Sequence, residues 1–234
     1  MVSIKNKLKF FSRVFSLAKT WGLLNILKFI PYEIYYGLRF GFGTLFSLNN
    51  DELDVSTKEK LYATEYLPTP YYIVKKTFSL VKTKLNNSTF IDFGSGAGRV
   101  MMFASLYDPK EITGVEFSEK LCNIASKNMQ DYFSESKNTG VKWNIVCIDA
   151  LKYEIKSTAN FFFFYDPFDE KIMQHIMLKI KNSCEDYPRD IFIVYISPRF
   201  RKIVNEMGFK ELYSDVNNYG KGYAIFNINS TLLQ

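Results

Sequence analysis

A glycine-rich segment in the middle of the chain constrains the fold most strongly. Residues 89–99 read TFIDFGSGAGR, an apolar run around the single acid Asp92 that leads into three closely spaced glycines. The apolar stretch VMMFASLY follows at residues 100–107. This order is typical of a buried parallel strand, a tight turn and a helix. Glycines let a ligand approach the backbone closely, and helix N–H groups add positive potential. A nucleotide or an adenosyl compound is therefore the expected ligand.

The spacing of the glycines distinguishes between cofactors. Dinucleotide-binding enzymes have the pattern G-x-G-x-x-G/A, and here Arg99 occupies its third small position. The chain shows instead G-x-G-x-G with an acid two residues before the first glycine. This pattern resembles motif I of class I S-adenosylmethionine-dependent methyltransferases. The resemblance implies S-adenosyl-L-methionine as cofactor, bound by Asp92, Gly94, Ser95, Gly96 and Gly98.

Two further strand ends extend the expected cofactor site. Residues 111–117, EITGVEF, predict a second strand that ends in Glu116, where a carboxylate can accept hydrogen bonds from both ribose hydroxyls. Ser118 is the expected N-cap of a helix over 118–132, so Glu116 is not needed for that purpose. The resemblance also implies that Asp149, after a third strand within 141–153, bonds the adenine amino group. The apolar neighbours of these acids, Phe117 and Ala150, are then expected to lie beside the cofactor.

The segment NFFFFYDPF at residues 160–168 predicts a central strand, because five consecutive aromatic residues are too apolar for an edge. Its end, Asp166-Pro167-Phe168, is similar to the Asn/Asp-Pro-Pro-aromatic motif of methyltransferases that act on planar or amine nitrogens. It lacks the second proline, which disfavours a nucleic-acid base or amide acceptor and leaves an amine open. We therefore take Asp166 as the candidate catalytic residue, with Pro167 and Phe168 in the acceptor pocket. The alternative is that Asp-Pro only marks a turn.

The remainder of the chain completes the same fold. A helix over 169–183, a strand over 190–196, a short helix over 199–207 and two closing strands are expected. The predicted fold is a seven-stranded, mostly parallel Rossmann-like methyltransferase sheet with a C-terminal antiparallel hairpin. A helical N-terminal extension (residues 1–58) precedes the methyltransferase domain (59–234), and the cofactor-binding core covers about 88–229.

The segment before the glycine-rich turn carries a cluster of tyrosines. Thr69 is a natural N-cap for a helix over 72–81 that Pro70 introduces. In several methyltransferase families this segment folds over the cofactor. The expected acceptor-pocket residues are accordingly Tyr66, Thr69 and Tyr71, since aromatic rings with a polar tip suit such pockets.

The positive charge is concentrated at the N-terminus. Residues 1–40 hold seven basic residues and one acid, 7 − 1 = +6, which equals the net charge of the whole chain. Residues 4–19 show an amphipathic helical pattern. Three interpretations stay open: a helix docked on the domain or covering the active site, an anchor on an anionic membrane surface, and nucleic-acid binding, which is the least favoured. The apolar run from Trp21 to Leu48 is interrupted by charges and a proline, so no transmembrane span is expected.

The chain offers few side chains that could act as a general base in methyl transfer. The only histidine, His175, falls in a helix after the fourth strand, so a hydroxyl acceptor would need Asp166, a tyrosine or another carboxylate as base. An amine needs only a neutral lone pair, and an amine nitrogen on a protein lysine or a small molecule is therefore favoured. The alternatives are O-methylation of a glycan or lipid-linked molecule at a membrane, and a non-catalytic scaffold or NAD-dependent oxidoreductase. The three cysteines form no C-x-x-C pair, and neither a disulfide framework nor a metal site is indicated. A cytoplasmic location, with possible attachment to the inner face of a membrane, is expected.

Overall fold

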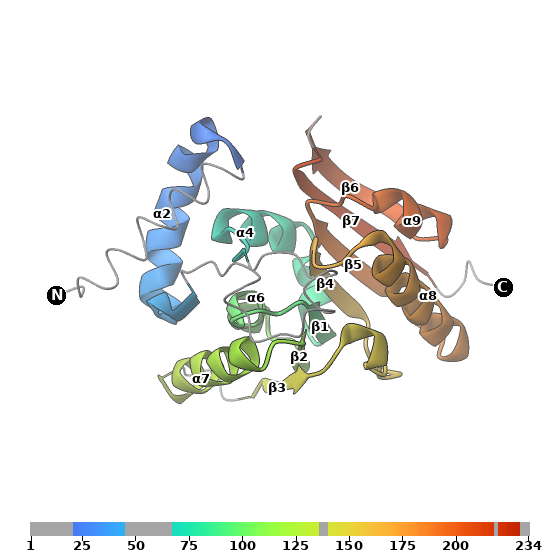
Figure 1. Ribbon diagram of the computed structural model, residues 1–234, viewed down its shortest axis with the longest axis horizontal. Helices are drawn as coiled ribbons and strands as arrows, with labels where there is room; N and C mark the ends of the chain where they lie inside the picture. Colours follow the sequence, from blue (N-terminus) through green and yellow to red (C-terminus); the bar gives the residue numbers. More distant parts are fainter. Residues whose placement is uncertain (1–20, 45–66, 136–139, 218–219, 230–234) are drawn as a thin grey trace.

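The computed structural model describes residues 21–44, 67–135, 140–217 and 220–229. Its centre is a seven-stranded sheet in the order β3-β2-β1-β4-β5-β7-β6, with helices on both faces (Figure 1). The first five strands are parallel, and β7 pairs antiparallel with both β5 and β6. The predicted fold class is thus confirmed. The strand order reverses at β1, where parallel sheets bind their ligands.

The strands follow the predicted apolar segments closely. Their bounds are β1 Thr89–Phe93, β2 Glu111–Glu116, β3 Lys142–Cys147, β4 Phe161–Tyr165, β5 Ile191–Ile196, β6 Lys210–Val216 and β7 Gly222–Ile228. The helices are α2 Leu23–Phe40, α4 Tyr71–Leu80, α5 Lys82–Leu85, α6 Arg99–Ala104, α7 Glu119–Glu135, α8 Glu170–Asp186 and α9 Arg201–Glu206. Single 3-10 turns lie at Phe42–Thr44, Ser105–Tyr107 and Ala150–Lys152.

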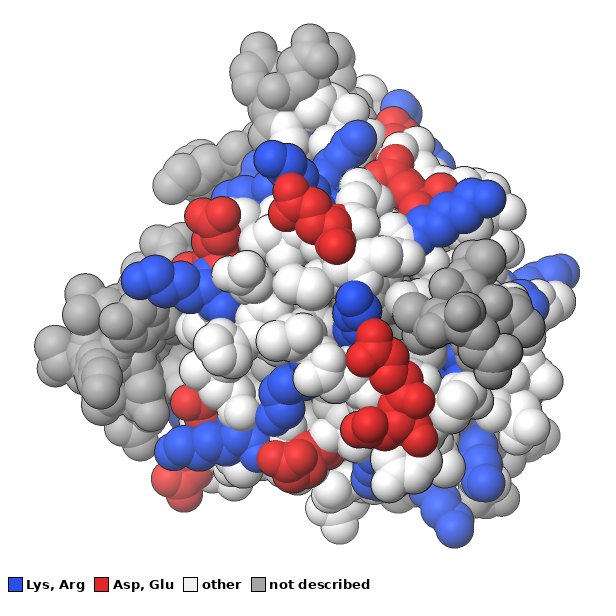
Figure 2. Space-filling model, turned by 90° about the vertical axis from the view of Figure 1, so that its right-hand side faces the viewer, with Lys and Arg blue, Asp and Glu red and all other residues white. Residues whose placement is uncertain are grey.

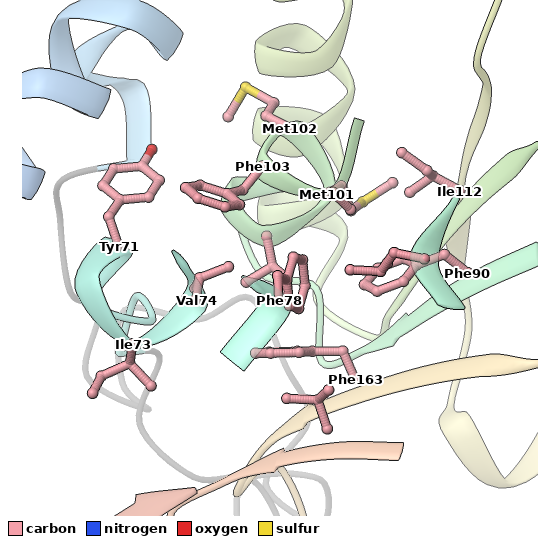
Figure 3. Packing of buried hydrophobic residues seen from close by; sticks show 14 of the residues in the cluster. Tyr71, Ile73, Val74, Phe78, Phe90, Met101, Met102, Phe103, Ile112 and Phe163 are labelled. Atoms are coloured by element: carbon pink, nitrogen blue, oxygen red, sulfur yellow. The ribbon is translucent and has the colours of Figure 1, made fainter. Parts of the chain in front are cut away.

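Successive side chains of each strand point to opposite faces of the sheet, so the core consists of two layers, one on each face. On β4, Phe161 and Phe163 face the layer that holds α2, α4 and α6, whereas Phe162 and Phe164 face the layer under α8 and α9. Figure 3 shows the first layer, with Phe78 of α4 between Phe103 of α6 and Phe163 of the sheet. Every residue of β1 and β5 is buried, as expected for central strands covered on both faces.

Of two predicted helix caps, one differs in the structure and one is confirmed. Helix α4 begins at Tyr71, and its N-cap is Pro70 with no side-chain cap, so Thr69 does not cap it. The carboxylate of Glu33 from α2 accepts a hydrogen bond from the Tyr71 N–H instead, at 2.9 Å. Ser118 does cap α7, since its Oγ accepts a 3.4 Å hydrogen bond from the Leu121 N–H. A distant carboxylate therefore replaced the local cap that the sequence suggested for α4.

The described part of the N-terminal extension packs on the domain. Phe29, Tyr36 and Phe40 of α2 are buried in the first core layer, where Tyr36 and Phe40 pack against Tyr71 and Phe103. The predicted amphipathic helix within 4–19 and the boundary near residue 58 lie outside the described residues. Within the described residues, no helix is long and apolar enough to cross a membrane.

Candidate active site

A cleft opens at the carboxyl ends of β1, β2 and β4. It is lined by fourteen residues from four segments: Leu67, Pro68 and Thr69 before α4; Asp92, Gly94, Ser95, Arg99 and Val100 around the glycine turn; Glu116, Phe117 and Leu121 after β2; and Phe163, Tyr165 and Pro167 on and after β4. The structure therefore brings together Thr69, Asp92, Gly94, Ser95, Glu116, Phe117 and Pro167 of the predicted site residues.

The glycine turn holds a backbone that other residues adopt with strain. Gly94, Gly96 and Gly98 have φ values of 74°, 53° and 81°, all in the left-handed region. The N–H groups of Gly94 and Ser95 both donate to the Val115 carbonyl, at 2.9 and 3.2 Å. These bonds fix the turn against the end of β2, so the two acids Asp92 and Glu116 face the same cleft.

Asp92 is a buried carboxylate without a full set of partners. Its side chain is 2% exposed, and Oδ2 has no hydrogen-bond partner among the described residues. Burial raises the pKa of the Asp92 carboxyl well above its ordinary range, and the nearby Glu116 charge raises it further. A buried acceptor of this kind requires a donor. The amino group of S-adenosylmethionine is a positively charged donor, so this cleft fits the cofactor.

The neutral variant Asp92→Asn is expected to be more stable than the wild type in the absence of cofactor. Because the folded-state pKa of Asp92 is raised, wild-type stability falls as pH rises from about 4 through that folded pKa. Asparagine does not titrate, so the difference should grow with pH and reach about 1–3 kcal/mol. Urea unfolding of both proteins between pH 4 and 8 measures it. A difference in the free energy of unfolding that stays constant across that range would show that burial of the charged Asp92 carboxylate does not destabilise the fold.

Glu116 connects the end of β2 to the glycine turn. Its Oε2 accepts a hydrogen bond from the Gly96 N–H at 3.0 Å, and its Oε1 accepts from the N–H groups of Phe117 and Ser118, also at 3.0 Å. Burial raises the pKa of Glu116, while these three backbone donors lower it. Each carboxylate oxygen has lone pairs beyond these bonds. Glu116 can therefore order the turn and accept from ribose hydroxyls together.

Replacing Glu116 by Gln is expected to weaken S-adenosylhomocysteine binding by about 1.5–3 kcal/mol, or roughly ten- to a hundredfold, because charge-assisted hydrogen bonds are lost. Glu119→Gln, three residues along at an exposed position of α7, is the matched control. Calorimetric titration of both variants measures the effect. An affinity of Glu116→Gln within twofold of the control would assign Glu116 a purely structural role.

The predicted adenine-binding residues lie outside the lining of this cleft. Asp149 caps the 3-10 turn at Ala150–Lys152 by accepting a 2.9 Å hydrogen bond from the Leu151 N–H. Ala150 is buried in the second core layer. The end of β3 still lies beside Glu116, because the Ile148 N–H donates to the Glu116 carbonyl at 2.9 Å. Contacts of Asp149 and Ala150 with the adenine remain a prediction.

Asp166 sits at the end of β4 in a strained conformation, with φ 39°. Its Oδ1 accepts hydrogen bonds from Arg199 Nε at 3.2 Å and from the Tyr195 hydroxyl at 3.5 Å. Burial raises the pKa of the Asp166 carboxyl, and the positive charges of Arg199 and Lys221 oppose this shift. Asp166 is absent from the cleft lining, whereas its neighbours Tyr165 and Pro167 line it. Arg199 already engages Asp166 Oδ1, and the carboxylate does not line the cleft, so Asp166 is not positioned to act as a general base on an acceptor bound there.

The other predicted acceptor residues separate into two groups. Thr69 and Pro167 line the cleft, whereas Tyr71 is fully buried beneath it and Phe168 packs edge-on against Phe93 and Phe164. Tyr66 lies outside the described residues. Phe163 and Tyr165 also line the cleft, although the aromatic run of β4 predicts only a buried strand. The alternation along β4, which points Phe163 and Tyr165 to one face, is the signal that could have found them.

Arg99 also lines the cleft, and the glycine pattern gives no role for its side chain. Its guanidinium is 2% exposed and donates to Glu33 Oε2 at 2.7 Å, to the Thr69 carbonyl at 3.2 Å, and to both Thr44 Oγ1 and the Thr44 carbonyl at 3.2 Å. It also stacks on the Tyr71 ring, 4.0 Å from the centroid. A single side chain thus joins the glycine turn to α2, to Thr44 and to the segment before α4.

Trp21, which precedes α2, connects the extension to the cleft. Trp21 Nε1 donates a 3.3 Å hydrogen bond to the hydroxyl of Tyr165, and the two rings lie 6.4 Å apart. Phe29 packs edge-on against Trp21 and stacks with Tyr72. An aromatic cluster (Trp21, Phe29, Tyr72 and Tyr165) therefore lies beside the β4 end of the cleft.

The chain matches a known family over the region that forms the cleft. The family model described as histone methylation protein DOT1 matches residues 66–184, about half of the chain. The matched region begins just before the cleft-lining residue Leu67 and ends within α8. It includes all the lining residues described above. No match is found among the curated proteins.

Solved structures with the same fold are distant in sequence. Magnesium protoporphyrin IX methyltransferase from Synechocystis PCC 6803, crystallised with bound SAH, is 13% identical, with a TM-score of 0.50 and coverage of 66% of this chain and 80% of that one. The Escherichia coli protein yhhF, provisionally described as a methyltransferase, is 14% identical, with a TM-score of 0.51 and coverage of 67% and 86%. The Pyrococcus horikoshii protein PH1948, provisionally described as an RNA methyltransferase, is 15% identical, with a TM-score of 0.50 and coverage of 68% and 83%. At these identities the likeness establishes the fold.

Proposed function

The chain belongs to the family described as histone methylation protein DOT1, whose members are S-adenosylmethionine-dependent methyltransferases, and we propose that it methylates an amine nitrogen. S-adenosyl-L-methionine supplies the methyl group when it is bound in the cleft. The acceptor has to reach that cleft at the end of β4, where parallel-sheet enzymes present their reacting groups. The residues there therefore decide which acceptors are suitable.

One observation carries the choice of an amine: the candidate base at the β4 end is already engaged. Asp166 accepts from Arg199 and Tyr195, and its carboxylate does not line the cleft. His175, the only histidine, is exposed on α8, which packs on the opposite face of the sheet from α4 and α6. A hydroxyl needs such a base to remove its proton, whereas a neutral amine brings its own lone pair.

The cleft also suits a positively charged amine and its methylated product. Tyr165 and Phe163 present aromatic side chains there. A cation near an aromatic face gains about 0.5–2 kcal/mol. The family description names a histone, which is a protein, as what is methylated. This supports a lysine side chain as the first acceptor to test.

The test is to supply methyl-labelled S-adenosylmethionine with two acceptor sets, lysine-rich proteins and hydroxyl-bearing glycans and lipids. After acid hydrolysis, label is expected in N-methyl amines. The rate should rise with pH as the amine loses its proton, and Asp166→Asn should retain most of the activity. Label recovered only as O-methyl groups, or activity that disappears in Asp166→Asn while that variant still binds S-adenosylhomocysteine, would refute the amine proposal.

A further inference from the structure

The outward face of α2 carries a stripe of exposed apolar side chains. Leu27, Ile34, Tyr35 and Leu38 are 79%, 42%, 56% and 64% exposed, and Pro31 between them is exposed as well. Their spacing of three and four residues places them along one side of the helix. We call these five residues the outer stripe. Exposed apolar residues that gather on one surface mark an interaction site more often than scattered ones do.

The inward face of the same helix is buried against the domain. Phe29, Glu33, Tyr36 and Phe40 are buried, at 2%, 1%, 8% and 7% exposure. Glu33 binds Arg99 and the N-terminus of α4, and the aromatic residues pack in the first core layer. The domain therefore fixes the orientation of α2. The outer stripe is directed away from the core, at the edge of the molecule where Figure 1 shows α2.

The exposed charged side chains of α2 itself have one sign. Among residues 1–44 the sequence contains seven basic residues and a single acid, Glu33. That acid is 1% exposed and ion-paired with Arg99, so it contributes nothing to the outer surface. Lys28 and Arg39 are exposed on α2, and five further basic residues precede it in sequence (Lys5, Lys7, Lys9, Arg13 and Lys19). By contrast, Figure 2 shows acidic and basic side chains interspersed on the side of the molecule far from α2.

We propose that the outer stripe of α2 docks on an anionic lipid surface. A helix with an apolar face, flanking lysine and arginine and no exposed acid is suited to the interface of a membrane that carries negative headgroups. A second copy of the chain fits less well, because a symmetric contact would bring two basic surfaces together. Because the inner face of α2 positions Arg99, and Trp21 just before it contacts Tyr165, docking would hold the cleft near the membrane.

The experiment uses the full chain with vesicles of phosphatidylcholine alone or with about a third phosphatidylglycerol, because lysine and arginine are attracted to an anionic surface. The chain is expected to float with the anionic vesicles only, and to be released as salt is raised from 0.05 to about 0.5 M. The double variant Leu27→Ser/Leu38→Ser should lose at least about tenfold in partitioning.

The matched control is Leu178→Ser/Leu212→Ser, which changes two leucines of α8 and β6 that are 43% and 40% exposed. It should bind vesicles like the wild type, and all variants should bind S-adenosylhomocysteine equally, which shows that they are folded. No binding to anionic vesicles at low salt would overturn the proposal. So would an equal loss in the control pair, or stripe-dependent dimerisation in place of vesicle binding. These outcomes leave the proposed amine acceptor untouched, because they do not measure methyl transfer.

Discussion

Replacing Arg99 by Met is expected to destabilise the protein by about 3–5 kcal/mol, because Glu33 would remain as a buried charge without its partner. The two side chains are 2% and 1% exposed, and their ion pair measures 2.7 Å. The guanidinium also satisfies the Thr69 and Thr44 carbonyls, so further buried acceptors lose their donors. Lysine would not substitute well, since it lacks the planar fork that reaches three segments at once.

The double variant Arg99→Met/Glu33→Leu provides the control for this prediction. It removes both charges, and it should therefore be more stable than Arg99→Met alone. A double-mutant cycle measures this by urea unfolding of the wild type, Arg99→Met, Glu33→Leu and the double variant. If Arg99→Met loses less than about 1 kcal/mol, the buried pair does not join the extension to the glycine turn, and α2 is only loosely attached.

The second large effect is expected at Gly94. A side chain at this position would be unfavourable for two reasons. The backbone has a φ of 74°, and an added Cβ would lie 2.8 Å from Cβ of Pro167. The left-handed backbone alone costs about 1–2 kcal/mol for alanine. The clash has to move either the glycine turn or the residue after Asp166, and both belong to the cleft. Gly94→Ala should therefore lower S-adenosylhomocysteine affinity more than about tenfold in addition to lowering stability.

Gly208→Ala is the matched control, because it introduces the backbone strain without the steric clash. Gly208 follows α9 with φ 92°, but the nearest atom to an added Cβ is 4.0 Å away, and the site is remote from the cleft lining. This variant should lose stability to a similar strain and keep its affinity. Thermal unfolding and calorimetry of both variants measure the comparison. Equal affinities in the two variants would show that the turn after β1 does not shape the cofactor site.

The fold could be predicted from the sequence because its signals are local and strong. The run of five aromatic residues in 161–165 can only be a central strand, and the glycine turn after β1 fixes the strand-to-helix order. The positions of Asp92 and Glu116 at one cleft could be predicted because strand ends are recognisable by position alone. The same reasoning placed Ser118 correctly as a cap.

The remainder of the site depends on contacts that span long sequence separations. In the sequence Arg99 stands out only because it departs from the dinucleotide-binding pattern, and its partner Glu33 lies 66 residues earlier. The cap of α4 is that same carboxylate, which overrode the local choice of Thr69. Asp166 was proposed as a base from its neighbours Pro167 and Phe168, but Arg199, 33 residues later, pairs with it. Periodicity and spacing carry no information about such partners.

The turn at residues 92–98 is expected to bind S-adenosylmethionine, and calorimetric titration of the wild type and Gly96→Val with S-adenosylhomocysteine measures this binding. Gly96 has φ 53°, and its N–H donates to Glu116. Valine at this backbone angle is strained, and it would displace the turn from the carboxylate. The wild type should bind one S-adenosylhomocysteine per chain, and the folded variant should show no measurable binding. Unchanged affinity in Gly96→Val would contradict this expectation.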